Sequence, residues 1–125
     1  KFRDIAVLTF YSGQLVEVNK ALSTVKQRKG TCKVHTVDSF QGSEAEIVFL
    51  SFVRANAAAQ VGFMSDFRRL NVALTRAKLK LIVLAHVQTL AKASDETGTH
   101  LKAFVQHGQA VTVDEARVKD ALTQI

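Results

Sequence analysis

The stretch "KVHTVDSFQGSEAEIVFLSFV", residues 33–53, contains two apolar runs separated by a polar loop with a single glycine. Both runs are short, strongly apolar and rich in β-branched residues, so we expect them to form strands. The loop follows the carboxyl end of the first strand, which is where open α/β sheets bind ligands. The stretch therefore predicts an α/β domain with a candidate binding loop at one edge of its sheet.

Two further runs of the same kind, at residues 4–9 and 79–85, lie on either side of this stretch. Segments with helical periodicity alternate with the runs, and the clearest of them, residues 14–29, has apolar residues along one helix face. Three of the four runs are apolar at almost every position, as strands covered on both faces are. We therefore predict a central, mostly parallel sheet flanked by helices.

The last third of the chain has weaker patterns. They indicate helices at about 87–93 and 100–107, a polar loop at 94–99, a short apolar stretch near 111–113 and a final helix from about 114. No internal boundary is visible, so we expect a single domain over residues 1–125. The chain begins without an initiator Met or a signal pattern, and we interpret it as a fragment of a longer protein.

The composition excludes several classes of protein. No apolar run approaches the roughly 20 residues that cross a bilayer, so we expect no membrane contact. Cys32 is the only cysteine and the histidines are scattered, so we expect neither a disulfide nor a metal site. A chain without disulfides suits a reducing compartment, so we expect an intracellular protein of the cytoplasm or nucleus. The formal charge of +6 favours polyanionic partners without identifying them.

The polar loop has residues suited to a phosphate or a nucleotide. Gly42 can take a positive φ or approach a ligand closely, and successive backbone N–H groups can hold phosphate oxygens. Ser39 and Gln41 add side-chain hydrogen bonds, and the carboxylate of Glu44 can accept hydrogen bonds from a ribose hydroxyl. Ordinary turn chemistry explains the same composition, so both interpretations stay open at this point.

A second candidate segment is "DFRRLNVALTRAK", residues 66–78. On one continuous helix its core-facing stripe would consist of Phe67, Leu70, Ala73, Leu74 and Ala77. Arg69 and Arg76 would then lie on the far side, two turns apart and within about 20° of each other. A solvated basic face is one interpretation. The use of Arg, with no carboxylate four residues before either one, favours bidentate recognition of phosphate instead.

These motifs together resemble those of a known family. "TVDSFQGSEAEIVFLSFVRAN" and "GFMSDFRRLNVALTRAK" closely resemble motifs V and VI of superfamily 1 helicases, in the up-frameshift-like branch, and "LTFYSGQ", residues 8–14, resembles motif IV. The resemblance covers residues 5–85. It implies a RecA-like fold and, more specifically, the second, C-terminal RecA-like domain of a helicase, which shares one ATP site with a first RecA-like domain.

The resemblance also implies roles for individual residues. Arg76 matches the catalytic arginine finger that reaches the γ-phosphate, and Glu44 matches the acid near the nucleotide sugar. The other nucleotide contacts that it implies are Tyr11, on which the base stacks, Gln14, Gly42 and Arg69. Contacts to the nucleic-acid backbone fall on Thr36, Ser39 and Gln41.

The chain departs from the family pattern in two respects. Motif IV usually reads Thr-Pro-Tyr, and Phe10 replaces the proline here, which leaves that loop less rigid. No Gly-x-x-x-x-Gly-Lys-Thr/Ser phosphate loop and no Asp-Glu magnesium motif occurs in the 125 residues. The resemblance therefore implies that the ligands of Mg²⁺ and much of the ATP site belong to a first domain absent from this chain, and that the isolated chain is inactive.

Two functions are compatible with these patterns. The first is one half of an ATP-dependent helicase that moves along single-stranded RNA or DNA. The second is a noncatalytic module that keeps the helicase fold and binds single-stranded nucleic acid through its basic charge. The sequence does not choose between RNA and DNA, because both polymers present the same phosphates.

Overall fold

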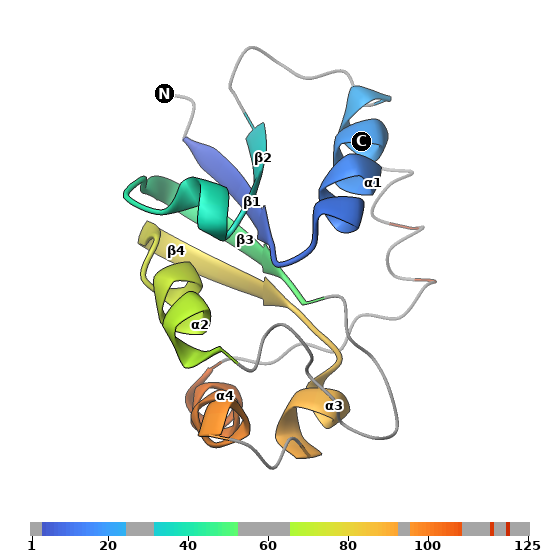
Figure 1. Cartoon of the computed structure of the whole chain (residues 1–125). Coiled ribbons are helices and arrows are strands. Elements are labelled where there is room, and N and C mark those ends of the chain that lie inside the picture. Colours follow the sequence, from blue (N-terminus) through green and yellow to red (C-terminus); the bar gives the residue numbers. More distant parts are fainter. Residues whose placement is uncertain are drawn as a thin grey trace.

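The described part of the chain forms a parallel α/β domain. The structure, a computed structural model, describes residues 4–24, 32–52, 66–92 and 96–108, together with residues 116 and 120. Its sheet has the strand order β2-β1-β3-β4, and all neighbouring strands are parallel (Figure 1). The strands are β1 (Ile5–Thr9), β2 (Cys32–Thr36), β3 (Ala45–Ser51) and β4 (Ala77–Leu84). The predicted α/β class with a parallel, RecA-like sheet is confirmed.

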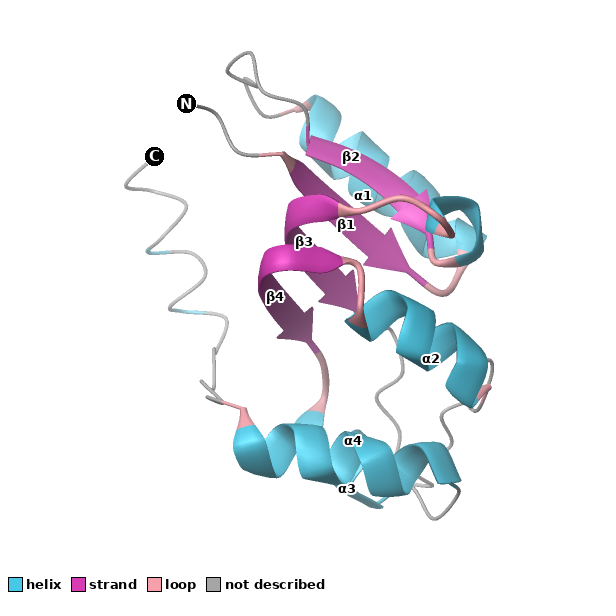
Figure 2. Ribbon diagram, turned by 90° about the vertical axis from the view of Figure 1, so that its left-hand side faces the viewer, coloured by secondary structure: helices cyan, strands magenta, loops and turns pink. Residues whose placement is uncertain are grey.

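Helices cover the sheet from both sides. Helix α1 (Ser12–Ser23) joins β1 to β2, and α2 (Phe67–Leu74) directly precedes β4. The chain moves in opposite directions along the sheet in these two crossovers, so right-handed connections place α1 and α2 on opposite faces. In Figure 2, α1 lies behind β1 and β2. The short 3-10 helix η1 (Asp38–Phe40) lies between β2 and β3.

The buried core lies between the sheet and helix α2. Strand register places Ala6 beside Val48 and Leu8 beside Leu50, and all four side chains are at most 2% exposed. The same apolar cluster includes Phe40 of η1 and, on α2, Leu70 and Ala73. Burying a leucine fully stabilises a fold by roughly 2 kcal/mol, so Leu70, together with Ala73, anchors α2 on the sheet.

Two helices follow the sheet, α3 (Val87–Lys92) and α4 (Glu96–His107), and they pack against each other beyond the carboxyl end of β4 (Figure 1). The prediction of α3 is confirmed. The polar loop predicted at residues 94–99 is wrong from Glu96 onward, because α4 already begins there. Glu96 lies in the first turn of α4, where the partial positive charge of the free N–H groups stabilises an acidic side chain. The polarity of this segment is therefore compatible with a helix start as well as with a loop.

Some predicted segments lie outside the described residues. Helix α1 was expected to reach residue 29, but it ends at Ser23, and residues 25–31 are not among those described. The apolar stretch near 111–113 also lies outside them. Of the predicted final helix only residues 116 and 120 are described, and both are helical. Within the described ranges, no helix combines the length and the apolar character needed to cross a bilayer.

Candidate functional site

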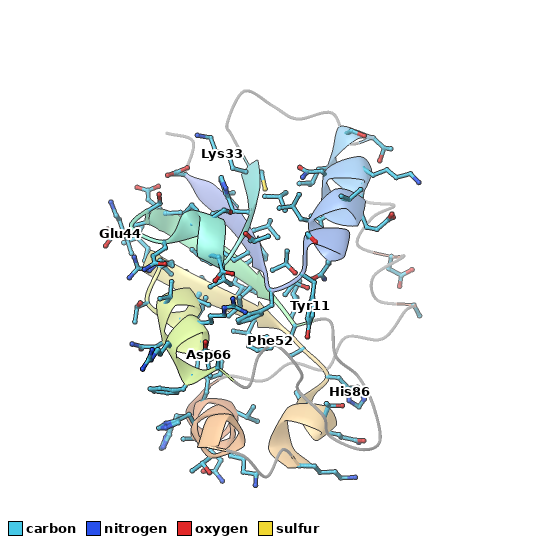
Figure 3. The ribbon with its side chains drawn as sticks, in the orientation of Figure 1. Tyr11, Lys33, Glu44, Phe52, Asp66 and His86 are labelled. Carbon is cyan, nitrogen blue, oxygen red and sulfur yellow. The ribbon has the colours of Figure 1, made fainter. Side chains whose placement is uncertain are left out.

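The residues predicted to form a site lie at two opposite edges of the sheet. Tyr11 follows the carboxyl end of β1, and Thr36 is the last residue of β2. Glu44 and Arg76 directly precede the amino ends of β3 and β4. The 7 residues of β3 separate the two edges by about 20 Å, at roughly 3.3 Å per residue. Figure 3 shows Glu44 and Tyr11 at these opposite ends.

Arg76 lies in the turn between α2 and β4, where neutral oxygens hold its guanidinium. Its Nε–H donates to the carbonyl oxygen of Val72 at 3.0 Å, and Nη1 donates to the carbonyl oxygen of Ser43 at 3.3 Å. Nη2 donates to the hydroxyl of Thr75 at 3.0 Å. No carboxylate in the described part of the chain pairs with this half-buried cation. Arg76 is therefore oriented, and its positive charge is available to an anion.

The helix that carries Arg69 ends before Arg76, so the predicted row of two arginines on one helix face is wrong. Helix α2 stops at Leu74, and Ala77, which was placed on its apolar stripe, is the first residue of β4. The backbone oxygen of Arg76 instead accepts a hydrogen bond from the N–H of Ala45, at 3.1 Å. Pairing with β3 thus overrides the helical propensity of the segment.

The side chain of Thr75 reinforces the end of α2. Its hydroxyl donates to the carbonyl oxygens of Asn71 and Val72, at 2.9 and 3.2 Å. The N–H of Thr75 donates to the same two carbonyls, at 3.2 and 3.3 Å, so the backbone and the side chain of Thr75 together stabilise the stop. The same hydroxyl accepts the bond from Arg76, so the turn that ends the helix also orients the arginine.

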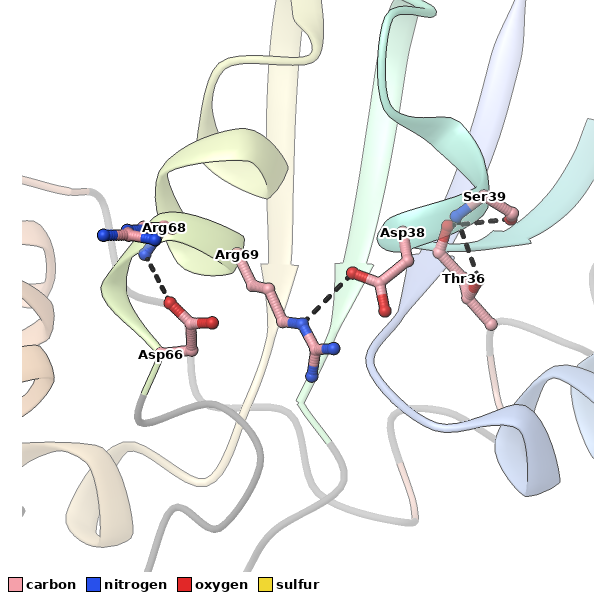
Figure 4. Close-up of polar contacts among 6 residues, drawn as sticks. All are labelled: Thr36, Asp38, Ser39, Asp66, Arg68 and Arg69. Carbon is pink, nitrogen blue, oxygen red and sulfur yellow. Dashed lines mark hydrogen bonds and ion pairs between the residues drawn. The ribbon is translucent and has the colours of Figure 1, made fainter.

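The start of α2 is well defined. The carboxylate of Asp66 accepts a hydrogen bond from the N–H of Arg68 at 2.9 Å, which caps the helix (Figure 4). Phe67 was predicted to face the core, but it is 38% exposed, and its ring lies 4.5 Å from that of His100 on α4. Its position in the first turn brings it over α4 rather than over the sheet.

Glu44 lies beside Arg76 at the amino edge. The loop reverses at Gly42, which has a φ of 82°, and this brings the carbonyl of Ser43 to the guanidinium of Arg76. The carboxylate of Glu44 pairs with the ammonium group of Lys78 at 3.5 Å, and both side chains are exposed. An exposed ion pair contributes only about 0–1 kcal/mol, so a ligand can readily exchange for Lys78 at this carboxylate.

Arg69 belongs to the opposite edge. Its Nε lies 3.2 Å from the Oδ1 of Asp38, the first residue of η1 (Figure 4). Its predicted neighbours in a nucleotide site, Glu44 and Arg76, lie at the far end of the strands. The structure therefore groups Arg69 with the loop that follows β2.

That loop is compact and presents polar groups to solvent. The N–H of Ser39 donates to the hydroxyl of Thr36 at 3.2 Å, and the hydroxyl of Ser39 donates to the carbonyl of Thr36 at 3.0 Å (Figure 4). Gln41 ends η1 and is exposed, like Ser39. Buried Phe40 anchors the loop on the sheet. The structure brings Thr36 and Ser39 into contact, and their predicted role in binding nucleic acid stays a prediction.

Gln14 and Tyr11 also lie at the carboxyl edge. The side-chain amide oxygen of Gln14 accepts a hydrogen bond from the hydroxyl of Thr9. Its Nε2 donates to the hydroxyl of Ser51 at 2.6 Å. It thus ties the end of β1 to the end of β3. The N–H of Tyr11 donates to the hydroxyl of Thr9 at 3.3 Å. Gln14 has a structural task here that the sequence did not indicate.

Phe10, which stands where the family has proline, has a packing role. It is partly buried, and its ring lies 5.4 Å from that of Phe52, at the end of β3. Aromatic pairs at such distances add about 0.5–1.5 kcal/mol to the free energy of unfolding beyond their buried area. This contact anchors the side chain of Phe10 on the core.

Sequence analysis missed two polar residues of these groups, Asp38 and Lys78. Each forms an ion pair with a residue distant in the chain, so no local spacing reveals it. The only signal was their presence inside the two quoted motifs. Cys32 belongs to neither group, and burial raises the pKa of its thiol. In the ranges that the structure describes, no three His, Cys, Asp or Glu side chains are placed to hold a metal ion.

Comparisons with known proteins identify relatives of the chain. Residues 1–88 match a family model described as an AAA domain. The chain is 42% identical to the probable helicase senataxin of Homo sapiens over 109 residues, which are 86% of this chain and 4% of that protein. It is 43% identical over 93 residues to the regulator of nonsense transcripts 1 homolog of Neurospora crassa, covering 71% of this chain and 8% of that protein.

A third relative is the DNA replication ATP-dependent helicase/nuclease of Homo sapiens. The chain is 46% identical to this relative over 88 residues, which are 70% of the chain and 8% of the relative. The chain therefore spans less than a tenth of the length of each of these three relatives.

Proposed function

Because the chain belongs to the up-frameshift-like branch of superfamily 1 helicases, we propose that it is the C-terminal motor domain of an ATP-dependent RNA or DNA helicase. In this proposal it supplies an arginine finger and nucleic-acid contacts to an ATP site that it shares with a first RecA-like domain of the same protein. The setting is intracellular, in the cytoplasm or the nucleus, where RNA and DNA are available.

The observation that carries the proposal is the juxtaposition of Arg76 and Glu44. They come from different connections, yet Arg76 lies 3.3 Å from the carbonyl of Ser43, the residue before Glu44. A guanidinium suits the γ-phosphate and a carboxylate suits the ribose hydroxyls, so the pair offers one group to each part of a nucleotide. Glu44 is exposed and Arg76 is half-buried at the same edge, which is where a second domain can complete a site.

Arg76 is the proposed catalytic residue. The charge on the γ-phosphoryl group spreads over its oxygens in the transition state, and a guanidinium in contact with them lowers the barrier. In the described domain three neutral acceptors orient this side chain, so no ion pair has to be broken before it turns toward phosphate. Arginine fingers contribute roughly 10³ to 10⁵ in rate in enzymes of this kind.

The amino edge fits a nucleotide with its metal ion only in part. Arg76 and Lys78 are cations, Glu44 accepts hydrogen bonds from hydroxyls, and Gly42 allows the loop to approach a ligand. Bound ATP supplies the phosphoanhydride bond whose hydrolysis drives the movement. We assign the ligands of Mg²⁺, and the phosphate loop, to the first RecA-like domain. The residues of this chain bind and orient the nucleotide from one side of the cleft.

We propose that the carboxyl edge contacts single-stranded nucleic acid. Thr36, Ser39 and Gln41 offer side-chain hydroxyl and amide groups of the kind that bind phosphate. Tyr11 lies at this edge, about one strand length from Arg76. A single nucleotide with its γ-phosphate at Arg76 is poorly placed to reach Tyr11. We therefore propose that Tyr11 and Gln14 belong to the nucleic-acid contacts and not to the nucleotide contacts. An aromatic ring can stack on a base of either polymer.

Steady-state hydrolysis by the full-length protein tests the proposal. Phosphate release from ATP should be detectable and should rise when poly(U) RNA or oligo(dT) is added. Binding of these polymers without any hydrolysis of ATP would support the noncatalytic binding module instead. In that case binding should weaken steeply with salt, because each neutralised phosphate releases counterions.

A further inference from the structure

Two segments of the domain contact each other at both of their ends. The loop segment, residues 36–45, contains η1, and the helix segment, residues 66–77, contains α2. At the carboxyl edge Asp38 and Arg69 form an ion pair at 3.2 Å. At the amino edge the guanidinium of Arg76 lies 3.3 Å from the carbonyl of Ser43, and the backbone oxygen of Arg76 accepts the N–H of Ala45. The two segments therefore form a closed frame.

Each side of the frame is anchored in the apolar core. Leu70 and Ala73 of the helix segment are 0% exposed, and Phe40 of the loop segment is 7% exposed. Close-packed side chains shift together, so a displacement at one end of either segment is transmitted to its other end. One end of the frame carries Thr36 and Ser39, and the other carries Arg76.

The two ends of the frame differ in strength. The amino edge is closed in part by a backbone hydrogen bond that continues the pairing of β3 with β4. The carboxyl edge is closed by side chains that are 32% and 63% exposed, for Arg69 and Asp38 respectively. Exposed ion pairs are weak, so this contact can open and close at little cost in stability. It is the part of the frame that a bound ligand can most easily influence.

We propose that the Asp38–Arg69 ion pair is a positioning contact, which couples nucleic-acid binding at the carboxyl edge to the orientation of Arg76 at the amino edge. This inference rests on the proposed function. A strand bound at Thr36 and Ser39 holds η1 and, with it, the carboxylate of Asp38. Arg69 then holds α2 in the orientation that presents Arg76 to the nucleotide. Neither Asp38 nor Arg69 touches the reacting atoms in this scheme.

The test uses the full-length protein with Asp38→Asn, which removes the charge and keeps the shape. We expect the ratio of ATP hydrolysis with saturating poly(U) or oligo(dT) to hydrolysis without it to fall roughly two- to fivefold, the range that an exposed ion pair can supply. The loss should be in kcat, with the KM for ATP changed less than twofold, because an arginine finger acts in the transition state. Asp38→Glu should restore most of the ratio.

The matched control is Glu17→Gln, which removes one negative charge from the exposed face of α1 and should leave the ratio unchanged. In a double-mutant cycle, Asp38→Asn combined with Arg69→Gln should lose no more of the ratio than Arg69→Gln alone. Additive losses would show that the two residues act separately and would overturn the inference.

Two other results would overturn it. In the first, Asp38→Asn raises the nucleic-acid concentration needed to stimulate ATP hydrolysis but leaves the maximal stimulated kcat unchanged. Asp38 would then be a binding residue. Asp38→Asn could also match wild type in every respect. In both cases the wild-type protein still shows stimulated hydrolysis, so the proposed function survives. Absence of stimulated hydrolysis in the wild-type protein would instead refute the proposed function, and the inference with it.

Discussion

The guanidinium of Arg76 lies against the backbone carbonyl of Ser43, with 3.3 Å between Nη1 and the oxygen. This contact joins the turn before β4 to the loop before β3, and so it places the finger candidate next to Glu44. The neighbouring backbone bond from Ala45 to Arg76 fixes the same approach. The position of Arg76 therefore depends on the loop before β3 as much as on the turn after α2.

Replacing Arg76 by alanine in the full-length protein should abolish most ATP hydrolysis. We expect kcat to fall by roughly 10³-fold or more, with the affinity for ATP much less affected, because the finger acts chiefly on the transition state. Phosphate release and nucleotide binding, measured separately, distinguish the two effects. Arg68→Ala, on the exposed face of the first turn of α2, is the matched control and should retain activity. Full activity of Arg76→Ala would refute the finger assignment.

Two glycines provide a matched pair for the loop geometry. Gly42→Ala should lower the free energy of unfolding by about 1 kcal/mol, because the φ of 82° disfavours a Cβ atom although nothing lies within 4 Å of it. Gly13→Ala also meets open space, but it lies in α1 and should raise the free energy of unfolding by roughly 0.5 kcal/mol. Denaturant titration measures both. Equal effects at the two positions would contradict the assigned backbone conformation.

Removing the cap of α2 should destabilise the chain. Asp66→Ala deletes the acceptor for the N–H of Arg68 and should cost about 1 kcal/mol of unfolding free energy. Asp66→Asn keeps a side-chain oxygen and should cost a few tenths of a kcal/mol at most. The difference between the two variants isolates the cap from other effects of the charge. If Asp66→Asn lowered the free energy of unfolding as much as Asp66→Ala, the effect would come from the charge and not from the cap.

The thiol of Cys32 predicts a dependence of stability on alkaline pH. Burial raises the pKa of Cys32 above its ordinary value of 9.0, so the folded chain holds the thiol proton more tightly than the unfolded chain does. The stability that this contributes is complete below the unfolded pKa and is lost as the pH rises through the folded pKa. The difference in unfolding free energy between wild type and Cys32→Ala should therefore be constant to about pH 8 and shift against wild type above it. A difference independent of pH up to 11 would contradict the burial of the thiol.

Much of the fold was predictable from periodicity. The apolar runs at residues 4–9 and 79–85 and the two runs in residues 33–53 correspond to the strands of the described sheet. The central strands β1 and β3 are largely buried, as continuous apolar runs predict, whereas the edge strand β4 leaves Leu79 63% and Leu84 53% exposed. The end of α2 was not predictable in this way. Residues 66–78 have the pattern of one helix, and only the hydrogen bond from Ala45 to Arg76 shows why the chain leaves the helix at Leu74.

The same distinction applies to the candidate site. The family, the parallel sheet and the residue types available for phosphate and for ribose follow from the sequence alone. Which of these residues are neighbours follows from the folded chain: Arg76 with Glu44 at the amino edge, and Arg69 with Asp38 at the carboxyl edge. The physical reason is that a strand of β3's length separates the two edges, while residues far apart in the chain meet at each edge through side-chain and backbone bonds that no local spacing encodes.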